Sequence, residues 1–192
     1  MGKEPLEPKQ KSPALTFREV TTETWSDLET LFESRGGPKA CWCLVWRDYK
    51  RKGDKQALKV YVDGGIPIGL IGYLDREPVA WCSIAPRSTY RPGLANVLPA
   101  DAGERIWSLA CFFLKRLHRG RRLFHSLLIA AQDHAIARGA TVLEAYPVDP
   151  DSPSYRFGGF LHAFEREGYV KMGRMGTRRH VVRRRLAKPG IS

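Results

Sequence analysis

The 192-residue chain has few acidic residues, with 20 Asp and Glu against 32 Lys and Arg. Its formal net charge of +12 and its pI of about 9.8 predict an anionic partner. Both a phosphorylated cofactor and a nucleic acid meet that description. The sequence also has no apolar run near the length of about 18 residues that a membrane helix needs, so we expect no contact with a membrane.

Patterns typical of metal sites and secreted proteins are missing as well. The four cysteines, Cys41, Cys43, Cys82 and Cys111, form no C-x-x-C motif, and no histidine pair has zinc spacing. We therefore expect free thiols, no metal site and a cytoplasmic location. Residues 1–13 have no signal-peptide apolar core and are predicted to be a disordered leader. Residues 14–187 contain no repeat or linker and predict a single domain.

Hydrophobic periodicity predicts alternating strands and helices, and thus the α/β class. We expect strands at Leu15–Val20, Ile68–Leu74, Pro78–Ala85, Ile106–Leu114, Thr141–Tyr146, Tyr169–Arg174 and Arg178–Leu186. Predicted helices follow a cap at Thr21 or Thr22, a cap at Asp54, and the basic turn at 115–122, and a short one carries Phe157 to Phe164. Residues 41–47 predict a short aromatic strand or turn, and 87–103 a loop.

The most informative segment is Trp107–Leu128, which reads WSLACFFLKRLHRGRRLFHSLL. An apolar strand runs into a basic turn, and the turn leads into an amphipathic helix. The first N–H groups of a helix have no partner within it, and the helix dipole adds positive charge there. Five Lys and Arg side chains surround that point. This arrangement predicts a binding site for the phosphates of a cofactor.

The segment resembles motif A of the GNAT acetyltransferases, with the pattern Q/R-x-x-G-x-G/A between the fourth strand and a helix. Residues 119–124, reading RGRRLF, take that place, and Arg122 and Phe124 stand where the family prefers glycine and a small residue. The element order matches too. The resemblance implies a mixed, mostly antiparallel sheet splayed between strands 4 and 5 and flanked by helices. It also implies binding of acetyl-CoA, by Phe112, Phe113 and Leu114 for the pantetheine arm and by Arg119, Gly120, Arg121, Arg122, Leu123 and Phe124 for the phosphates.

Acetyl transfer to an amine needs a group that takes the proton of the amine and, commonly, one that protonates the leaving thiolate. Glu144 is the candidate base, because a carboxylate inside the apolar stretch VLEAYP is unexpected unless it serves a cleft. Alternatively, it points to solvent or pairs with a basic neighbour. The tyrosine that the family commonly uses as acid is replaced by Phe164. Tyr155, Tyr146 or a water is then the predicted proton donor.

Several residues could form an acceptor site. Trp42, Trp46 and Trp81 could line a substrate pocket or pack in the core, and Asp149 and Asp151 could bind a cationic acceptor or form a turn. The arginine-rich run from Arg174 to Arg185 could be a solvated face or bind an acidic ligand.

These observations predict an acetyl-CoA-dependent N-acetyltransferase acting on a primary amine of a small molecule. The stretches WCLVWR, SIAPRSTY, CFF and EAYPVD resemble a branch with kasugamycin 2′-N-acetyltransferase-like resistance enzymes. That resemblance implies an aminoglycoside-type acceptor and a role in antibiotic resistance. Two alternatives stay open: a GNAT enzyme acting on a protein or aminoacyl-tRNA amine, and a non-catalytic nucleic-acid-binding domain with the same fold. Nucleic acid is the less expected partner, and whether the chain forms a homodimer stays open.

Overall fold

A computed structural model describes residues 15–119 and 122–186. Its main feature is a seven-stranded sheet in the order β1-β2-β3-β4-β5-β7-β6. The strands are β1 (Leu15–Glu19), β2 (Leu70–Leu74), β3 (Glu77–Pro86), β4 (Ile106–Leu114), β5 (Val142–Ala145), β6 (Val170–Met175) and β7 (Arg179–Arg185). All neighbours are antiparallel except β4 and β5. The structure thus confirms the predicted α/β class and mixed sheet.

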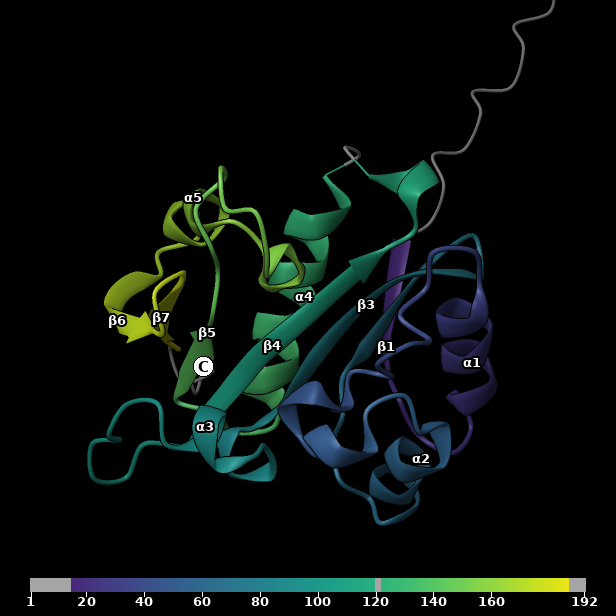
Figure 1. Ribbon diagram of the computed structural model, residues 1–192, viewed down its shortest axis with the longest axis horizontal. Coiled ribbons are helices and arrows are strands. Elements are labelled where there is room, and N and C mark those ends of the chain that lie inside the picture. The colour runs from purple at the N-terminus through teal and green to yellow at the C-terminus, as the bar shows by residue number, and fades with distance from the viewer. Residues whose placement is uncertain (1–14, 120–121, 187–192) are drawn as a thin grey trace, which may run out of the picture.

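Helices cover both faces of this sheet (Figure 1). One face packs against α1 (Trp25–Glu33) and α2 (Lys55–Asp63), and the other against α4 (Leu123–Ala137) and α5 (Leu161–Arg166). Short helices η1 (Leu44–Trp46), η2 (Tyr49–Arg51), η3 (Arg87–Thr89), α3 (Pro92–Ala95), η4 (Arg116–His118) and η5 (Arg156–Gly158) lie in the connections. No helix in these two described stretches combines the length and apolar character needed to cross a membrane.

Two local predictions need correction, and one pair of alternatives is decided. The residue before α1 is Thr24, and its hydroxyl donates to the Glu19 carbonyl instead of capping the helix, so neither Thr21 nor Thr22 is the cap. Of the two alternatives at residues 41–47, a strand or a turn, the turn is confirmed, because these residues form turns and η1. Phe157 belongs to η5, and α5 begins only at Leu161. The predicted cap at Asp54 is confirmed, because its side chain accepts from the Ala57 N–H at 3.0 Å.

The sheet splays between β4 and β5. Their pairing begins at Ile106 with Val142 and stops at Leu109 with Ala145, although β4 continues to Leu114. Two features of the sequence explain the separation. Pro147, shortly after β5, has no N–H with which to extend the ladder. A bulge opposite β3 leaves one extra residue in β4, between Leu109 and Cys111, and bulges bend the strand that carries them.

Parts of three predictions lie outside the described residues. They are the leader at 1–13, the first and last residues of the predicted domain at 14 and 187, and Gly120 with Arg121 in the basic turn.

Candidate active site

A pocket of about 750 Å³ lies beside the splayed end of β4. Its walls contain every described residue that the sequence assigned to the cofactor: Phe112, Phe113, Leu114, Arg119, Arg122, Leu123 and Phe124. The opposite wall comes from η5 and α5, with residues that sequence reasoning did not single out for the site: Arg156, Phe157, Gly159, Phe160, His162, Ala163, Arg166 and Glu167. We call this cavity the β4–α4 pocket. Segments 112–124 and 156–167 are far apart in sequence, so local patterns could not show that they face each other.

The start of α4 faces this pocket with backbone N–H groups. Among the described residues, the first helical bond of α4 runs from the Ser126 N–H to the Arg122 carbonyl at 3.0 Å. The N–H groups of Leu123, Phe124 and His125 precede it and have no partner within α4. Because the helix dipole and the side chains of Arg119 and Arg122 add positive charge, this wall suits the phosphates of an anionic ligand.

Arg122 has the backbone conformation of a glycine. Its φ of 56° and ψ of 9° lie in the left-handed region, at the position where the GNAT motif prefers glycine. The exposed arginine therefore keeps the local turn at a cost in strain.

Phe124, at the small-residue position of the motif, packs its ring 4.8 Å from that of Phe112 and 5.9 Å from that of Phe164. A Cβ on Gly159 would come within 2.9 Å of the Phe124 ring. The aromatic ring thus fills space beside the pocket, and the glycine opposite makes room for it.

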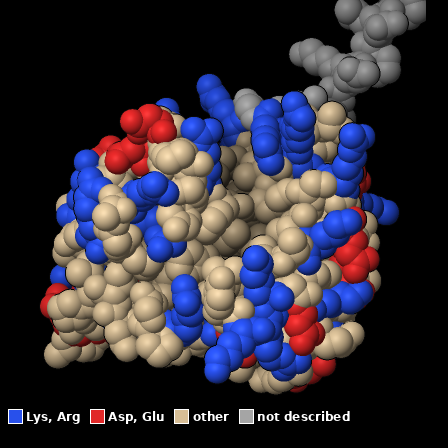
Figure 2. All heavy atoms as spheres, viewed as in Figure 1, with Lys and Arg blue, Asp and Glu red and all other residues tan. Residues whose placement is uncertain are grey.

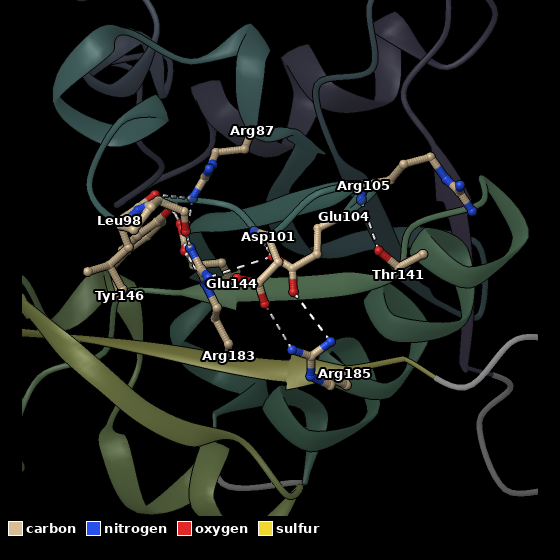
Figure 3. Close-up of polar contacts among 11 residues, drawn as sticks. Arg87, Leu98, Asp101, Glu104, Arg105, Thr141, Glu144, Tyr146, Arg183 and Arg185 are labelled. Atoms are coloured by element: carbon tan, nitrogen blue, oxygen red, sulfur yellow. Dashed lines mark hydrogen bonds and ion pairs between the residues drawn. The ribbon is translucent and has the colours of Figure 1, made fainter.

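Glu144 is fully buried in a polar network one residue pair before β4 and β5 separate (Figure 3). Its Oε1 accepts a hydrogen bond from the Tyr146 hydroxyl at 2.6 Å. Its Oε2 lies 2.7 Å from Nε of Arg183 and 3.3 Å from Nη1 of Arg87. The alternative that Glu144 pairs with basic neighbours therefore describes its contacts. Because both oxygens are occupied, any role of Glu144 as a base is restricted to indirect proton transfer.

Hydrogen bonds continue from Glu144 across the sheet. The Tyr146 hydroxyl donates its hydrogen bond to Glu144, so Ser108 Oγ, 2.9 Å away, donates to the Tyr146 oxygen. The Tyr90 hydroxyl in turn donates to the Ser108 carbonyl at 3.2 Å. Burial, and then the charge of Glu144, raise the pKa of Tyr146 well above its usual value. The Tyr146 hydroxyl thus stays protonated and donates a hydrogen bond to Glu144.

The remaining predicted site residues are separated by the structure. Trp42 and Trp81 are buried in the core, with Phe32 5.1 and 5.4 Å from them, so core packing, the second of the two alternatives, describes their contacts. Asp149 is hydrogen-bonded to Nε2 of His180 at 2.9 Å, and this bond lowers the pKa of Asp149. Asp151 is exposed in a turn.

Tyr155 is 39% exposed, and its ring lies 6.1 Å from that of Phe157, which lines the β4–α4 pocket. Of the two tyrosines proposed as proton donors, it is the one that reaches the surface beside the pocket. The Trp46 ring also contacts Phe157, and the centres of these two rings lie 6.1 Å apart.

Comparison with solved structures gives the same fold. The GNAT domain of S. lividans PAT is 15% identical, with a TM-score of 0.59 over 91% of this chain and 97% of that chain. The PaiA N-acetyltransferase of Thermoplasma acidophilum, solved with coenzyme A, is 12% identical, with a TM-score of 0.55 over 90% and 99%. A ribosomal-protein alanine N-acetyltransferase of Escherichia coli is 9% identical, with a TM-score of 0.54 over 93% and 97%.

These identities show the fold alone. No protein-family model and no curated protein sequence matches the chain.

Proposed function

We propose that the chain is an acetyl-CoA-dependent N-acetyltransferase that acts on a primary amine of a small molecule. The proposal is supported by the GNAT fold, and by the splayed β4 and the basic start of α4, which face one pocket. The observation that carries this proposal is the β4–α4 pocket. It combines the end of β4, not paired with β5 beyond Leu109, with the N–H groups of α4. An extended pantetheine arm can pair with the first, and phosphates with the second.

The chain's own groups have distinct tasks in this proposal. The α4 start with Arg119 and Arg122 binds the phosphates, and the backbone of Phe112–Leu114 orients the arm. When bound, the cofactor supplies the activated acetyl group. Tyr155, beside the pocket, is the proposed proton donor to the thiolate. Glu144, held by Arg87 and Arg183, would take the amine proton only through an intervening group.

Two kinds of acceptor amine are candidates. The sequence suggests an aminoglycoside-type amine such as kasugamycin, to be held by carboxylates. In the structure, however, Glu144 is engaged with two arginines and Asp149 with His180. A protein amine is a second candidate, because the E. coli neighbour is named as an N-acetyltransferase of a ribosomal-protein alanine.

Two measurements test the proposed function. Acetyl-CoA at about 100 times its dissociation constant should stabilise the protein by about 2.7 kcal/mol, and release of coenzyme A thiol should follow addition of an acceptor amine. Arg119→Glu should weaken binding sharply, because it places a negative charge beside the phosphates. Arg35→Glu is the matched control, since Arg35 is exposed after α1 and does not line the pocket. No change in melting temperature with millimolar acetyl-CoA would refute the proposal.

A further inference from the structure

A group of arginines and aromatic rings lies beside the β4–α4 pocket. It consists of Trp46 from η1, Arg91 before α3, Tyr155 and Phe157 at η5, and Arg179 at the start of β7; we call it the arginine–aromatic cluster. The Arg179 guanidinium carbon lies 4.8 Å from the centre of the Trp46 ring and 4.4 Å from that of Tyr155. The corresponding Arg91 carbon lies 5.6 Å from the Trp46 ring. Both cations therefore pack on one indole.

Neither cation has an anionic partner among the described residues. No ion pair or side-chain hydrogen bond of Arg91 or Arg179 occurs in that part of the chain, and Nε of each is buried without a hydrogen-bond partner. The neighbouring carboxylate, Asp149, is bound to His180. Burial, together with the nearby charge of Arg91, lowers the pKa of Arg179. Two like charges held together and partly desolvated favour a bound anion.

Stacking against aromatic rings does not occupy the N–H donors of the Arg91 and Arg179 guanidinium groups. The N–H groups of a guanidinium lie in its plane, so a ring against its face does not occupy them. They match the two oxygens of a carboxylate in a bidentate arrangement. Stacking also limits the freedom of the long arginine side chains, which reduces the entropy lost when a ligand binds.

Backbone strain also occurs at this cluster. Tyr155 has a φ of 63°, in the left-handed region that a bulky aromatic residue rarely adopts. Such strain costs about 1–3 kcal/mol and is often found at ligand sites. Here it accompanies the stacking of the Tyr155 ring with Arg179 at 4.4 Å.

The cluster adjoins the proposed cofactor site. Phe157 lines the β4–α4 pocket and lies 6.1 Å from both Trp46 and Tyr155, and η5 packs against β4. Figure 2 shows a hollow in the viewed face of the molecule, with many Lys and Arg side chains and fewer Asp and Glu side chains around it. A ligand at the cluster would thus lie close to the splayed strand, in surroundings that favour negative charge.

We propose that the arginine–aromatic cluster binds a carboxylate of the acceptor, so that the substrate is a small amine that also carries a carboxylate. This inference rests on the proposed function and names its substrate class. It differs from the cationic acceptor suggested by the sequence, because the unpaired charges beside the pocket are positive. The carboxylate binds Arg91 and Arg179, and the amine at the other end points toward the splayed strand.

The test follows thiol release from acetyl-CoA by the full chain with matched acceptors. The panel contains amino acids with the amine and carboxylate at different separations, the carboxamide of each, aminoalkyl phosphonates of the same lengths, and kasugamycin. We expect at least one amino acid to exceed its own amide by 10-fold or more in kcat/KM, because the amide lacks the negative charge that pairs with the guanidinium groups. A phosphonate that exceeds every carboxylate identifies a different anion and overturns the carboxylate assignment.

Substitutions of the two arginines test whether the preference for a carboxylate arises at the cluster. Arg179→Gln and Arg91→Gln should each raise KM for the preferred amino acid about 10-fold to 100-fold, with the dissociation constant of coenzyme A unchanged. Arg179→Lys retains the charge without the planar fork and should fall between. Arg178→Gln is the control, because Arg178 binds Ser154 and lies outside the cluster; its KM should not change.

The two proposals fail in different ways. Equal rates with acids and amides, or a preference for amides, overturn the carboxylate assignment while acetyl transfer stands. Absence of coenzyme A binding refutes the proposed function itself.

Discussion

Replacing Arg122 by glycine should stabilise the protein relative to replacing it by alanine. Arg122 has a φ of 56°, where a Cβ is strained, whereas Arg119 has a φ of −66° and a ψ of 146°, which any residue adopts. The two positions flank the same basic turn. Variants at both remove the same charge, so each glycine and alanine pair isolates the backbone effect.

The magnitude follows from two opposing terms. A left-handed conformation costs an L-residue about 1–2 kcal/mol, and glycine loses about 0.5–1 kcal/mol more than alanine in chain entropy on folding. At position 122 the difference favours glycine by about 0.5–1 kcal/mol. At position 119 only the entropy term acts and favours alanine by about 0.5–1 kcal/mol.

Thermal unfolding of the four variants without ligand measures this difference. For a chain of this size, 1 kcal/mol corresponds to about 2–4 °C in melting temperature. Arg122→Gly should therefore melt about 1–4 °C above Arg122→Ala, and Arg119→Gly should melt below Arg119→Ala by a similar amount. If Arg122→Gly melts below Arg122→Ala, position 122 does not have a left-handed backbone, and the reasoning fails.

Three further predictions concern other parts of the fold. Glu144→Gln should lower the free energy of unfolding by about 3–5 kcal/mol, because it leaves Arg87 and Arg183 without their buried partner; denaturant titration measures this, and a loss below 1 kcal/mol would contradict it. Asp54→Ala should cost about 1 kcal/mol in the same assay through the lost cap, and an unchanged midpoint would contradict the cap. Burial lowers the pKa of His134, against the opposing charge of Glu19. The neutral form is then favoured by folding, so the stability it provides is complete above its unfolded pKa of about 6.5 and decreases as the pH falls through that value. His134→Gln should reduce the loss of melting temperature on the acid side, and an identical pH profile would contradict this.

The fold could be predicted from the sequence because its elements carry local signals. The Asp54 cap and the strand, basic turn and helix around Arg119 are readable from neighbouring residues. The cap of α1 was misplaced because Thr21, Thr22 and Thr24 are chemically equivalent candidates, and only the contact of Thr24 with Glu19 distinguishes them.

The acceptor side of the site was harder to predict because it joins distant segments. Trp42 and Trp46 look alike in the sequence and both are buried in the core, yet of the two it is Trp46 whose ring packs against two arginines. Arg91 and Arg179 are 88 positions apart, and no periodicity connects them. Their clustering depends on the packing of four separate segments of the chain, which local patterns do not encode. A run of positively charged residues could have suggested an anionic ligand, but not its position.

Hydrogen exchange of the full chain with and without acetyl-CoA measures directly where the cofactor binds. We expect slower exchange of the backbone amides at 112–114, which would pair with the pantetheine arm, and at 123–125, which would face the phosphates. The exposed amides around Arg35 should not change. Binding without protection at either segment, or protection confined to another part of the molecule, would contradict the assignment of the β4–α4 pocket as the cofactor site.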